Sequence, residues 1–391
     1  KPTNDNIGFL NIKNTSLLAN IDLLKDVLKN DQEIETQDIT LRFRSRLELD
    51  PKDNWKHLFL PSSKWGQGKE ILDNFLEKFN CIPITEVFKV TRGNADNNGG
   101  KKHLLLHEDN PIHQGIEPMF RGPAVWNSHS IFNRHLSLRK QDIEVQEAVH
   151  FPSKYDDNVA DGFPNGVTGY PGFRKYWDEG IKEAEKDNAD KNPPKTGIEE
   201  SRKTWRKRVN SAFGGKYDDI DILIPRTDRT KHAIYLNTLT DIVVYSTNIA
   251  LLMDFKLSTT VHLKEKQKKF HTAFLLSTFG QLQIELVAGD QEGARKLELG
   301  HIKKLFVPNS SDIDIGILDS INLEFDKLAA APSNFIGVEG VDGVRKDLDL
   351  AVGTYLFSQD TLGFSNVEEF VEDAVKILER LPRLQKQLKE R

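Results

Sequence analysis

The chain has 391 residues, of which 38% are hydrophobic and 29% are charged, and its net charge is −5. This length predicts two or three domains with a sizeable core, and the composition excludes collagen-like and low-complexity proteins. A single cysteine, Cys81, excludes an intramolecular disulfide framework, a cysteine-rich zinc site and an iron–sulfur cluster. It also favours a reducing, cytoplasmic compartment.

Signals for membranes and export are missing from the sequence. No stretch approaches the ~18 apolar residues that a membrane span requires, and no basic-then-apolar leader opens the chain. We therefore expect no membrane partner and no secretion. The first residue is Lys1 rather than Met, so we expect either a fragment of a longer protein or a chain that lacks its first residues.

The first hundred residues alternate between helical and extended patterns. Apolar residues recur at helical spacing over 14–30 and again over 66–79, which predicts two amphipathic helices. Residues 82–90 alternate like a strand and lead into a loop rich in Asn and Gly at 94–100. Residues 101–107 are typical of the returning strand.

The middle of the chain predicts loops, a charged helix and a sheet. Residues 151–172 are rich in Gly, Pro, Asn and Asp, and residues 176–191 predict a charged helix. Short apolar runs then follow at the spacing of an antiparallel sheet. These runs are residues 221–224, 233–237, 242–245 and 249–255.

The remainder of the chain is helical in pattern. Helical periodicity covers residues 264–287, and three further helices are predicted at about 311–330, 341–356 and 366–390. We therefore expect a mixed α+β fold, in which small antiparallel or mixed sheets combine with helices and a helical region ends the chain.

Familiar catalytic signatures are absent from the sequence. We find no glycine-rich dinucleotide loop, no phosphate loop, no GxSxG nucleophile elbow and no HExxH zinc motif. Residues 192–195 (NPPK) resemble the NPPY loop of adenine methyltransferases, but Lys195 replaces the aromatic ring that stacks on a flipped base. We interpret this segment as a linker.

One nuclease pattern stays open as an alternative. Asp221 lies in a predicted strand, and Asp254 and Lys256 end another. An acid on one strand and an acid-x-Lys on its neighbour can hold Mg²⁺ and orient a water molecule. The simpler interpretation is an exposed strand end.

The strongest chemical signal is a basic run at residues 202–208. Cations at this spacing share helix faces, and they can neutralise DNA phosphates. Residues 202–231 carry nine Lys and Arg against four Asp, which gives +5 inside a chain of −5. The alternative is a solvated helix that pairs with the acidic stretch 183–200. A second lysine cluster lies at residues 264–269, and its alternative interpretation is likewise a solvated helix face.

Five segments resemble, in order, the C-terminal target-recognition half of bacterial gamma-class adenine-specific DNA methyltransferases of restriction–modification and phage-defence systems. The last-but-one segment is the most specific, while residues 94–97 and 289–291 depart from the family pattern. The segments are residues 84–94 (ITEVFKVTRGN), 115–120 (GIEPMF), 222–248, 276–308 and 345–352 (RKDLDLAV).

The resemblance implies recognition of double-stranded DNA without methyl-transfer chemistry on this chain. No cofactor is expected here, because S-adenosylmethionine would bind a catalytic half or subunit that the chain does not contain. The implied division is a helical connector at 1–80, a DNA target-recognition domain at 81–310 and a helical region at 311–391.

The candidate DNA-binding residues fall into three groups. Arg202, Arg206, Lys207 and Arg208 are expected at phosphates, and Lys231 extends their charge. Those expected to reach bases are Trp205, Arg226 and Arg229. Weaker candidates on loops are Asn94, Asn98, Arg121 and Asn127.

Three hypotheses compete. The leading one is a DNA-recognition module that positions an adenine for methylation elsewhere. The second is a Mg²⁺-dependent restriction endonuclease that uses Asp221, Asp254 and Lys256. The third is a protein-interaction subunit whose basic run binds an acidic partner.

Overall fold

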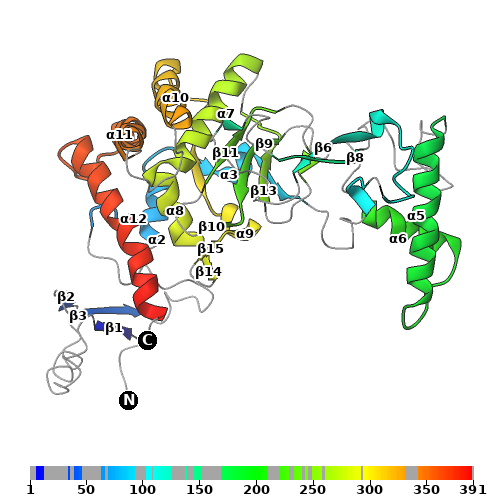
Figure 1. Cartoon of the computed structure of the whole chain (residues 1–391). Helices are drawn as coiled ribbons and strands as arrows, with labels where there is room; N and C mark the ends of the chain where they lie inside the picture. The colour runs from blue at the N-terminus through cyan, green and yellow to red at the C-terminus, as the bar shows by residue number, and fades with distance from the viewer. Residues whose placement is uncertain are drawn as a thin grey trace.

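The fold is described from a computed structural model (Figure 1). The structure describes residues 6–12, 34–35, 39–45, 63–66, 69–93, 103–107, 109–125, 137–138, 144–150, 169–209, 220–228, 233–239, 243–244, 249–257, 260–291, 294–331 and 342–389.

A five-stranded sheet lies at the centre of the molecule, in the order β5–β13–β9–β11–β7. β5, β13, β9 and β11 are antiparallel neighbours, and the short β7 runs parallel to β11. Every residue of β9 is buried, as expected of an apolar strand covered on both faces. The strands are β5 (Lys89–Arg92), β13 (Ile249–Met253), β9 (Ile220–Pro225), β11 (Tyr235–Asn237) and β7 (Ser137–Leu138).

The two faces of this sheet belong to different cores. Successive side chains of a strand point to opposite faces. Ile222 and Ile224 accordingly belong to the core of the main body, whereas Leu223 belongs to a second core. The sheet therefore joins two hydrophobic regions.

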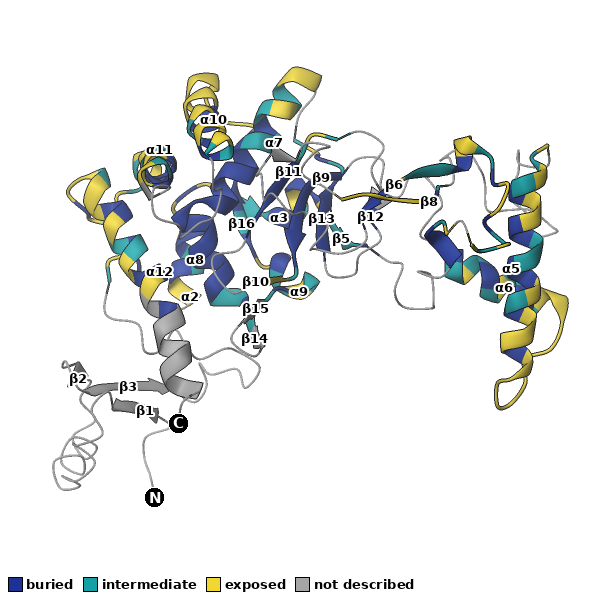
Figure 2. Cartoon of the chain, viewed as in Figure 1, coloured by how far each residue is buried: buried dark blue, intermediate teal, exposed yellow. Residues whose placement is uncertain are grey.

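Helices cover the main-body face of the sheet, and Figure 2 shows burial concentrated where α7 and α8 meet it. At the centre of this core, Trp65 packs against Phe370 with ring centroids 4.5 Å apart. The helices are α2 (Lys69–Glu77), α7 (Val261–Leu276), α8 (Thr278–Val287), α10 (Ile315–Ala330), α11 (Asp342–Gln359) and α12 (Val367–Lys389).

A smaller lobe contains α5 (Pro171–Ala189) and α6 (Ile198–Val209). Figure 1 shows this helix pair at the opposite end of the molecule from α11 and α12, with β6 and β8 between the pair and the central sheet. Aromatic rings fill its core, including Phe173, Trp177 and Trp205, all of which are buried. We call this region the helical lobe.

Short strands and helical turns complete the fold. The strands form four small sheets, ordered β1–β3–β2, β12–β6–β8, β10–β15–β14 and β16–β4. The elements are β1 (Asn6–Ile12), β2 (Ile34–Glu35), β3 (Ile39–Ser45), β4 (Cys81–Pro83), α3 (Ile84–Val87), η5 (Pro118–Phe120), β6 (Arg121–Val125), β8 (Gln146–Val149), β10 (Thr227–Asp228), β12 (Val243–Val244), β14 (Gly289–Gln291), β15 (Ala294–Lys296), α9 (Leu299–Ile302) and β16 (Phe306–Pro308).

The mixed fold predicted from the sequence is confirmed. The helices predicted over 66–79, 176–191 and the last eighty residues correspond to α2, α5 and α10–α12, and the predicted antiparallel pairing of β9, β11 and β13 is present. The predicted run 242–245 contains β12, which pairs in parallel with β6 in another sheet, so its assignment to the antiparallel sheet is wrong. The domain boundaries near residues 80 and 310 stay predictions. Across the described helices, none is long and apolar enough to cross a membrane.

Three local predictions need correction. The strand predicted over 82–90 is interrupted by α3, because Ile84 and Val87 are both buried and a helical turn places residues three apart on one side. The strand predicted over 101–107 reduces to a bridge from Leu105 to Ala148 next to a helical turn. The segment 1–80, predicted as helical, contains β1, β2 and β3, while the helix predicted over 14–30 lies outside the described residues.

The single helix predicted over 264–287 is two helices that meet at Ser277. The backbone of Ser277 is extended, with φ −62° and ψ 165°. Gly280 permits the sharp turn, because a Cβ atom there would lie 2.5 Å from the Cα atom of Leu275. The apolar pattern is continuous through the turn, so periodicity alone could not reveal it.

Candidate nucleic-acid interface

The basic run lies on α6, as predicted. Acidic Glu199 and Glu200 lie in its first turn and Arg206, Lys207 and Arg208 in its last, which is the arrangement that the helix dipole favours. The opposite face of the helix is buried. This helix therefore presents its charges from a fixed scaffold.

Trp205 cannot stack on a base in this structure, which corrects that prediction. Its side chain is fully buried, with its ring 5.3 Å from that of Tyr176 and 5.1 Å from that of His103. Gly180 of α5 faces it so closely that a Cβ atom would lie 2.2 Å from the indole. Trp205 is thus the ring that joins α6 to α5.

Most of the cations in the basic run have acidic partners. Arg202 pairs with Glu199 at 2.8 Å and Arg208 with Asp187 at 2.5 Å, and the Arg208 side chain is only 10% exposed. These pairs match the alternative in which the run pairs with the acidic stretch 183–200. Lys207 is exposed and Arg206 is half-buried. DNA contact by these four residues stays a prediction.

Arg121 has a structural role that the sequence did not suggest. Its Nε donates to the carbonyl of Ile116 at 2.8 Å, and its guanidinium pairs with Glu147 at 3.4 Å. The residue after Ile116 is Glu117, whose carboxylate accepts hydrogen bonds from the backbone N–H groups of Gly172 and Phe173 at the start of α5. Arg121 therefore helps to hold the segment that anchors the helical lobe. The candidates Asn94, Asn98, Asn127, Arg229 and Lys231 lie outside the described residues.

The geometry does not support the nuclease alternative. Asp221 is 1% exposed and pairs with Lys268 at 2.5 Å, while its other oxygen accepts the N–H of Phe255 at 3.0 Å. Burial raises the pKa of Asp221, although its contacts with Lys268 oppose that shift. The carboxylate is therefore a buried structural group.

The other two residues of that alternative point elsewhere. Asp254 pairs with Lys89 at 3.3 Å, and the Lys256 Nζ donates to the carbonyl of Thr85 at 2.8 Å. Within the described ranges, no three His, Cys, Asp or Glu side chains are grouped so that they could hold a metal ion. The predicted lysine cluster is also neutralised, since Lys266 pairs with Asp319 and Lys269 with Asp326.

A small pocket lies at one end of the central sheet. We call it the arginine pocket; its lining residues are Arg92, Arg226, Ala250, Leu297, Glu298 and Leu299. Arg92 on β5 is paired with Ala250 on β13, and Ala250 in turn with Ile224 on β9, two residues before Arg226. Arg226 directly follows the end of β9, and both arginines contribute to the lining of this one pocket.

Glu298 lines this pocket beside Arg226. It is the N-cap of α9, where it forms a capping box with His301. Its carboxylate pairs with Arg226 and, at 3.0 Å, with Lys296. The hydrogen bonds from Arg226 and then Lys296 hold the pKa of Glu298 below its usual range. Glu298 is therefore an anion at neutral pH.

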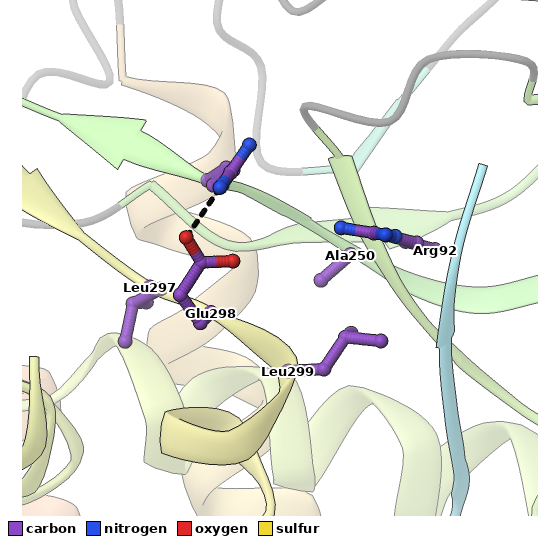
Figure 3. A pocket seen from close by; sticks show the side chains of 6 residues that line it. Arg92, Ala250, Leu297, Glu298 and Leu299 are labelled. Atoms are coloured by element: carbon purple, nitrogen blue, oxygen red, sulfur yellow. Dashed lines mark hydrogen bonds and ion pairs between the residues drawn. The ribbon is translucent and has the colours of Figure 1, made fainter. Parts of the chain in front are cut away.

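Arg92 is the cation that sequence reasoning missed. Figure 3 shows its guanidinium pointing across the pocket toward Glu298. It is half-buried, and it forms no ion pair with an acidic side chain in the described part of the chain. Only the pairing of β5 with β13 and β9 brings Arg92 and Arg226 together, and that pairing is not visible in the sequence.

Comparisons with known proteins point to one family. A family model described as the specificity domain of restriction endonuclease BpuSI matches residues 91–328. The solved structure of the type IIG restriction endonuclease BpuSI is similar, with a TM-score of 0.53 and 19% sequence identity. At that identity the likeness shows the fold alone.

The structural match covers different shares of the two chains. It covers 97% of this chain but 40% of the BpuSI chain, so this chain spans about two fifths of that protein's length. No curated protein matches the chain. The range 91–328 contains the arginine pocket, α5 and α6.

Proposed function

Because the chain belongs to the family of the BpuSI specificity domain, we propose that it recognises a specific sequence in double-stranded DNA. In this proposal it is the specificity module of a bacterial restriction–modification enzyme that contributes to phage defence. The observation that carries the proposal is the family match over residues 91–328, which includes both candidate basic sites.

The chemistry of the described residues fits a recognition role. Sequence-specific binding needs cations for phosphates and polar side chains for base edges, but no activated acid or nucleophile. The exposed Lys207 and the arginine pocket supply cations. The buried pair of Asp221 and Lys268 supports structure rather than hydrolysis.

We propose further that the recognised site contains an adenine that is methylated. The motif order described above supports this, and S-adenosylmethionine would then bind a catalytic domain or subunit outside this chain. Such a division is physically reasonable, because base flipping requires a catalytic pocket and a second surface that grips the duplex. A protein with this role works in the cytoplasm, at the nucleoid.

Selection from random duplex DNA tests the proposal. Purified chain would be incubated with a random-sequence library, bound duplexes amplified over several rounds, and the enriched sequences compared. We expect one motif, bound about a thousandfold or more tightly than unrelated duplex. Enrichment of no motif, or equal binding to all duplexes, would contradict sequence recognition.

The methylation part needs a separate readout. Genomic DNA from the source bacterium would be sequenced by a method that detects N6-methyladenine. We expect modified adenine within the selected motif. Motif copies that carry unmodified adenine, or a modified cytosine, would refute the adenine proposal while leaving DNA recognition intact.

A further inference from the structure

We propose that the arginine pocket binds a backbone phosphate of DNA through Arg92 and Arg226, with Glu298 as the positioning residue for Arg226. This inference rests on the proposed DNA-recognition function and adds a defined anchoring site to it. Three observations carry it: the position of both arginines on the lining of one pocket, the excess positive charge, and the recess in which they lie.

Strand pairing brings the two arginines to the lining of one pocket. β13 separates β5 from β9, its Ala250 pairs with both Arg92 and Ile224, and Arg226 directly follows the end of β9. The strands of a sheet are ~4.8 Å apart, so β5 and β9 lie about 10 Å apart across β13. Two long cationic side chains therefore line the pocket beside a small residue, Ala250.

The charges around the pocket do not cancel. Arg92, Arg226 and Lys296 contribute three positive charges, and Glu298 contributes one negative charge, so two positive charges remain. A phosphodiester carries one negative charge and accepts hydrogen bonds in the planar geometry that guanidinium groups offer. The arrangement therefore suits a phosphate better than a neutral ligand.

Glu298 fixes the geometry of Arg226. The carboxylate is itself held by Lys296 and by the capping box of α9, so the guanidinium of Arg226 is oriented by a rigid partner. The Arg226 side chain is 26% exposed, so it is partly accessible to solvent. Among the described residues, Arg92 has no acidic partner, so its charge is not offset as that of Arg226 is.

Recessed arginines favour phosphate contact over base reading. A base-reading arginine must extend into a groove, whereas Arg92 and Arg226 stay beside the apolar Leu297 and Leu299 of the pocket. A phosphate protrudes from the duplex and can enter such a recess. We therefore expect the pocket to fix the position of the DNA rather than to read its sequence.

The test combines Arg92→Ala and Arg92→Lys with modified DNA. Binding to the selected duplex would be measured at several salt concentrations, together with duplexes in which single phosphates are replaced by uncharged methylphosphonates. Arg92→Ala should weaken binding about tenfold and reduce the salt slope by about 0.9. Arg92→Lys should keep the slope but lose affinity, because it cannot bind bidentately.

Matched controls make the outcomes distinct. Lys327→Ala removes an exposed α10 cation that is paired with Glu324 and should leave binding unchanged. One methylphosphonate position should weaken the wild type but not Arg92→Ala, which identifies the contacted phosphate. Variants of the target site should lose affinity equally in wild type and Arg92→Ala.

Specific outcomes would overturn the inference. If wild type binds its motif but Arg92→Ala binds equally well with the same salt slope, the pocket is not an anchor and the proposed function survives. If Arg92→Ala relaxes specificity at one base pair, Arg92 reads a base instead. If wild-type protein binds no duplex at low salt, the proposed function itself fails.

Glu298 has its own test. Glu298→Gln keeps an oxygen acceptor for Arg226 and removes a charge that repels phosphate, so binding should be at least as tight as in wild type. Loss of binding that is confined to particular sequences would make Glu298 a base-reading residue and overturn its positioning role.

Discussion

Asp349 of α11 accepts two hydrogen bonds from Thr278, one from its backbone N–H at 2.6 Å and one from its hydroxyl at 2.7 Å. Thr278 is the first residue of α8, so a side chain 71 residues away satisfies an N–H group that α8 itself cannot. Arg345 lies beside the same carboxylate at 3.7 Å, and all three groups are buried.

We predict that Asp349→Ala destabilises the main body by about 3–5 kcal/mol, because it leaves Thr278 unsatisfied and the Arg345 charge buried without its acid. Urea denaturation followed by circular dichroism measures this. Asp347→Ala, at an exposed position on the same helix, is the control and should change the free energy of unfolding by less than about 0.5 kcal/mol. Equal midpoints for both variants would refute the role of Asp349.

Gly180 and Trp205 determine how closely α5 and α6 pack. Gly180→Ala places a Cβ atom 2.2 Å from the indole, so either the helices separate or the ring moves. We predict a loss of about 1–3 kcal/mol and faster amide exchange in the helical lobe. Hydrogen exchange monitored by mass spectrometry measures this locally.

The control for that prediction is Gly343→Ala, because a Cβ atom at Gly343 meets nothing within 4 Å. In a helix that change should be neutral or stabilise by up to about 1 kcal/mol. Unchanged exchange in α5 and α6 of Gly180→Ala would show that the lobe tolerates the methyl group.

The case of Trp205 shows what the sequence could and could not predict. Ser201, Trp205 and Val209 recur every four residues and are all buried, so the spacing already marked an inward-facing stripe. The interpretation from sequence instead gives more weight to the surrounding cations and therefore assigns Trp205 to DNA contact. Helices with continuous amphipathic patterns, such as α10 and α12, were predictable because their periodicity is local.

The arginine pocket was not predictable from the sequence. Arg92 follows the strand predicted over 82–90, and Arg226 follows the strand predicted over 221–224, but nothing local relates the two arginines. Their proximity depends on the register of β5, β13 and β9, in which a shift by one residue would place Arg92 on the other face. Long-range strand pairing of this kind determines which side chains meet in a site, and it cannot be predicted from local patterns in a single sequence.

Lys207 and Arg208 should respond differently to alanine substitution. Lys207 is exposed, so Lys207→Ala should leave the melting temperature unchanged, weaken binding to all duplexes and reduce the salt slope by about 0.9. Arg208 pairs with Asp187 and is largely buried, so Arg208→Ala should also lower the stability of the helical lobe. Thermal denaturation and DNA titrations at several salt concentrations separate these effects.

The control for α6 is Lys376→Ala on α12, where the lysine is 73% exposed and lies 4.0 Å from Glu372. It should alter neither property. If Lys207→Ala binds duplex DNA like wild type at every salt concentration, the basic run does not contact phosphates, and the arginine pocket becomes the main candidate.

The buried pair of Asp221 and Lys268 gives a prediction about the central sheet. Lys268→Met leaves Asp221 without its cation and should destabilise the fold by about 3–5 kcal/mol. The double variant Asp221→Leu with Lys268→Met removes both charges and should recover much of that loss. Urea denaturation of the four proteins of this cycle gives the coupling energy.

Lys269→Met provides the control for this cycle, since Lys269 pairs with Asp326, whose side chain is 52% exposed, and should cost little. A double variant that is less stable than Lys268→Met would contradict the predicted recovery. It would mean that Asp221 stabilises the fold even without Lys268. Mg²⁺ should shift none of these midpoints, whereas a metal site at Asp221 would predict stabilisation by the ion.

His271 should make stability depend on pH. It is fully buried on α7, and its Nε2 lies 3.0 Å from the Ser310 hydroxyl. Its Nδ1 has no hydrogen-bond partner among the residues that the structure describes. Burial lowers the pKa of His271 from 6.5 to about 3, so the folded protein keeps the ring neutral. Between pH 6.5 and about 3, His271 is therefore protonated in the unfolded chain but stays neutral in the folded chain.

The free energy of unfolding should therefore fall as the pH drops from 7 toward 3, with His271 contributing up to about 1.4 kcal/mol per pH unit over most of that range. His271→Gln keeps a polar group for Ser310 and has no titrating ring, so it should lose this part of the slope. Urea denaturation of both proteins at pH 7, 6, 5 and 4 gives the difference. Parallel curves would assign the acid sensitivity to other groups, because a buried His271 with a depressed pKa requires the wild type to lose stability relative to His271→Gln as the pH falls.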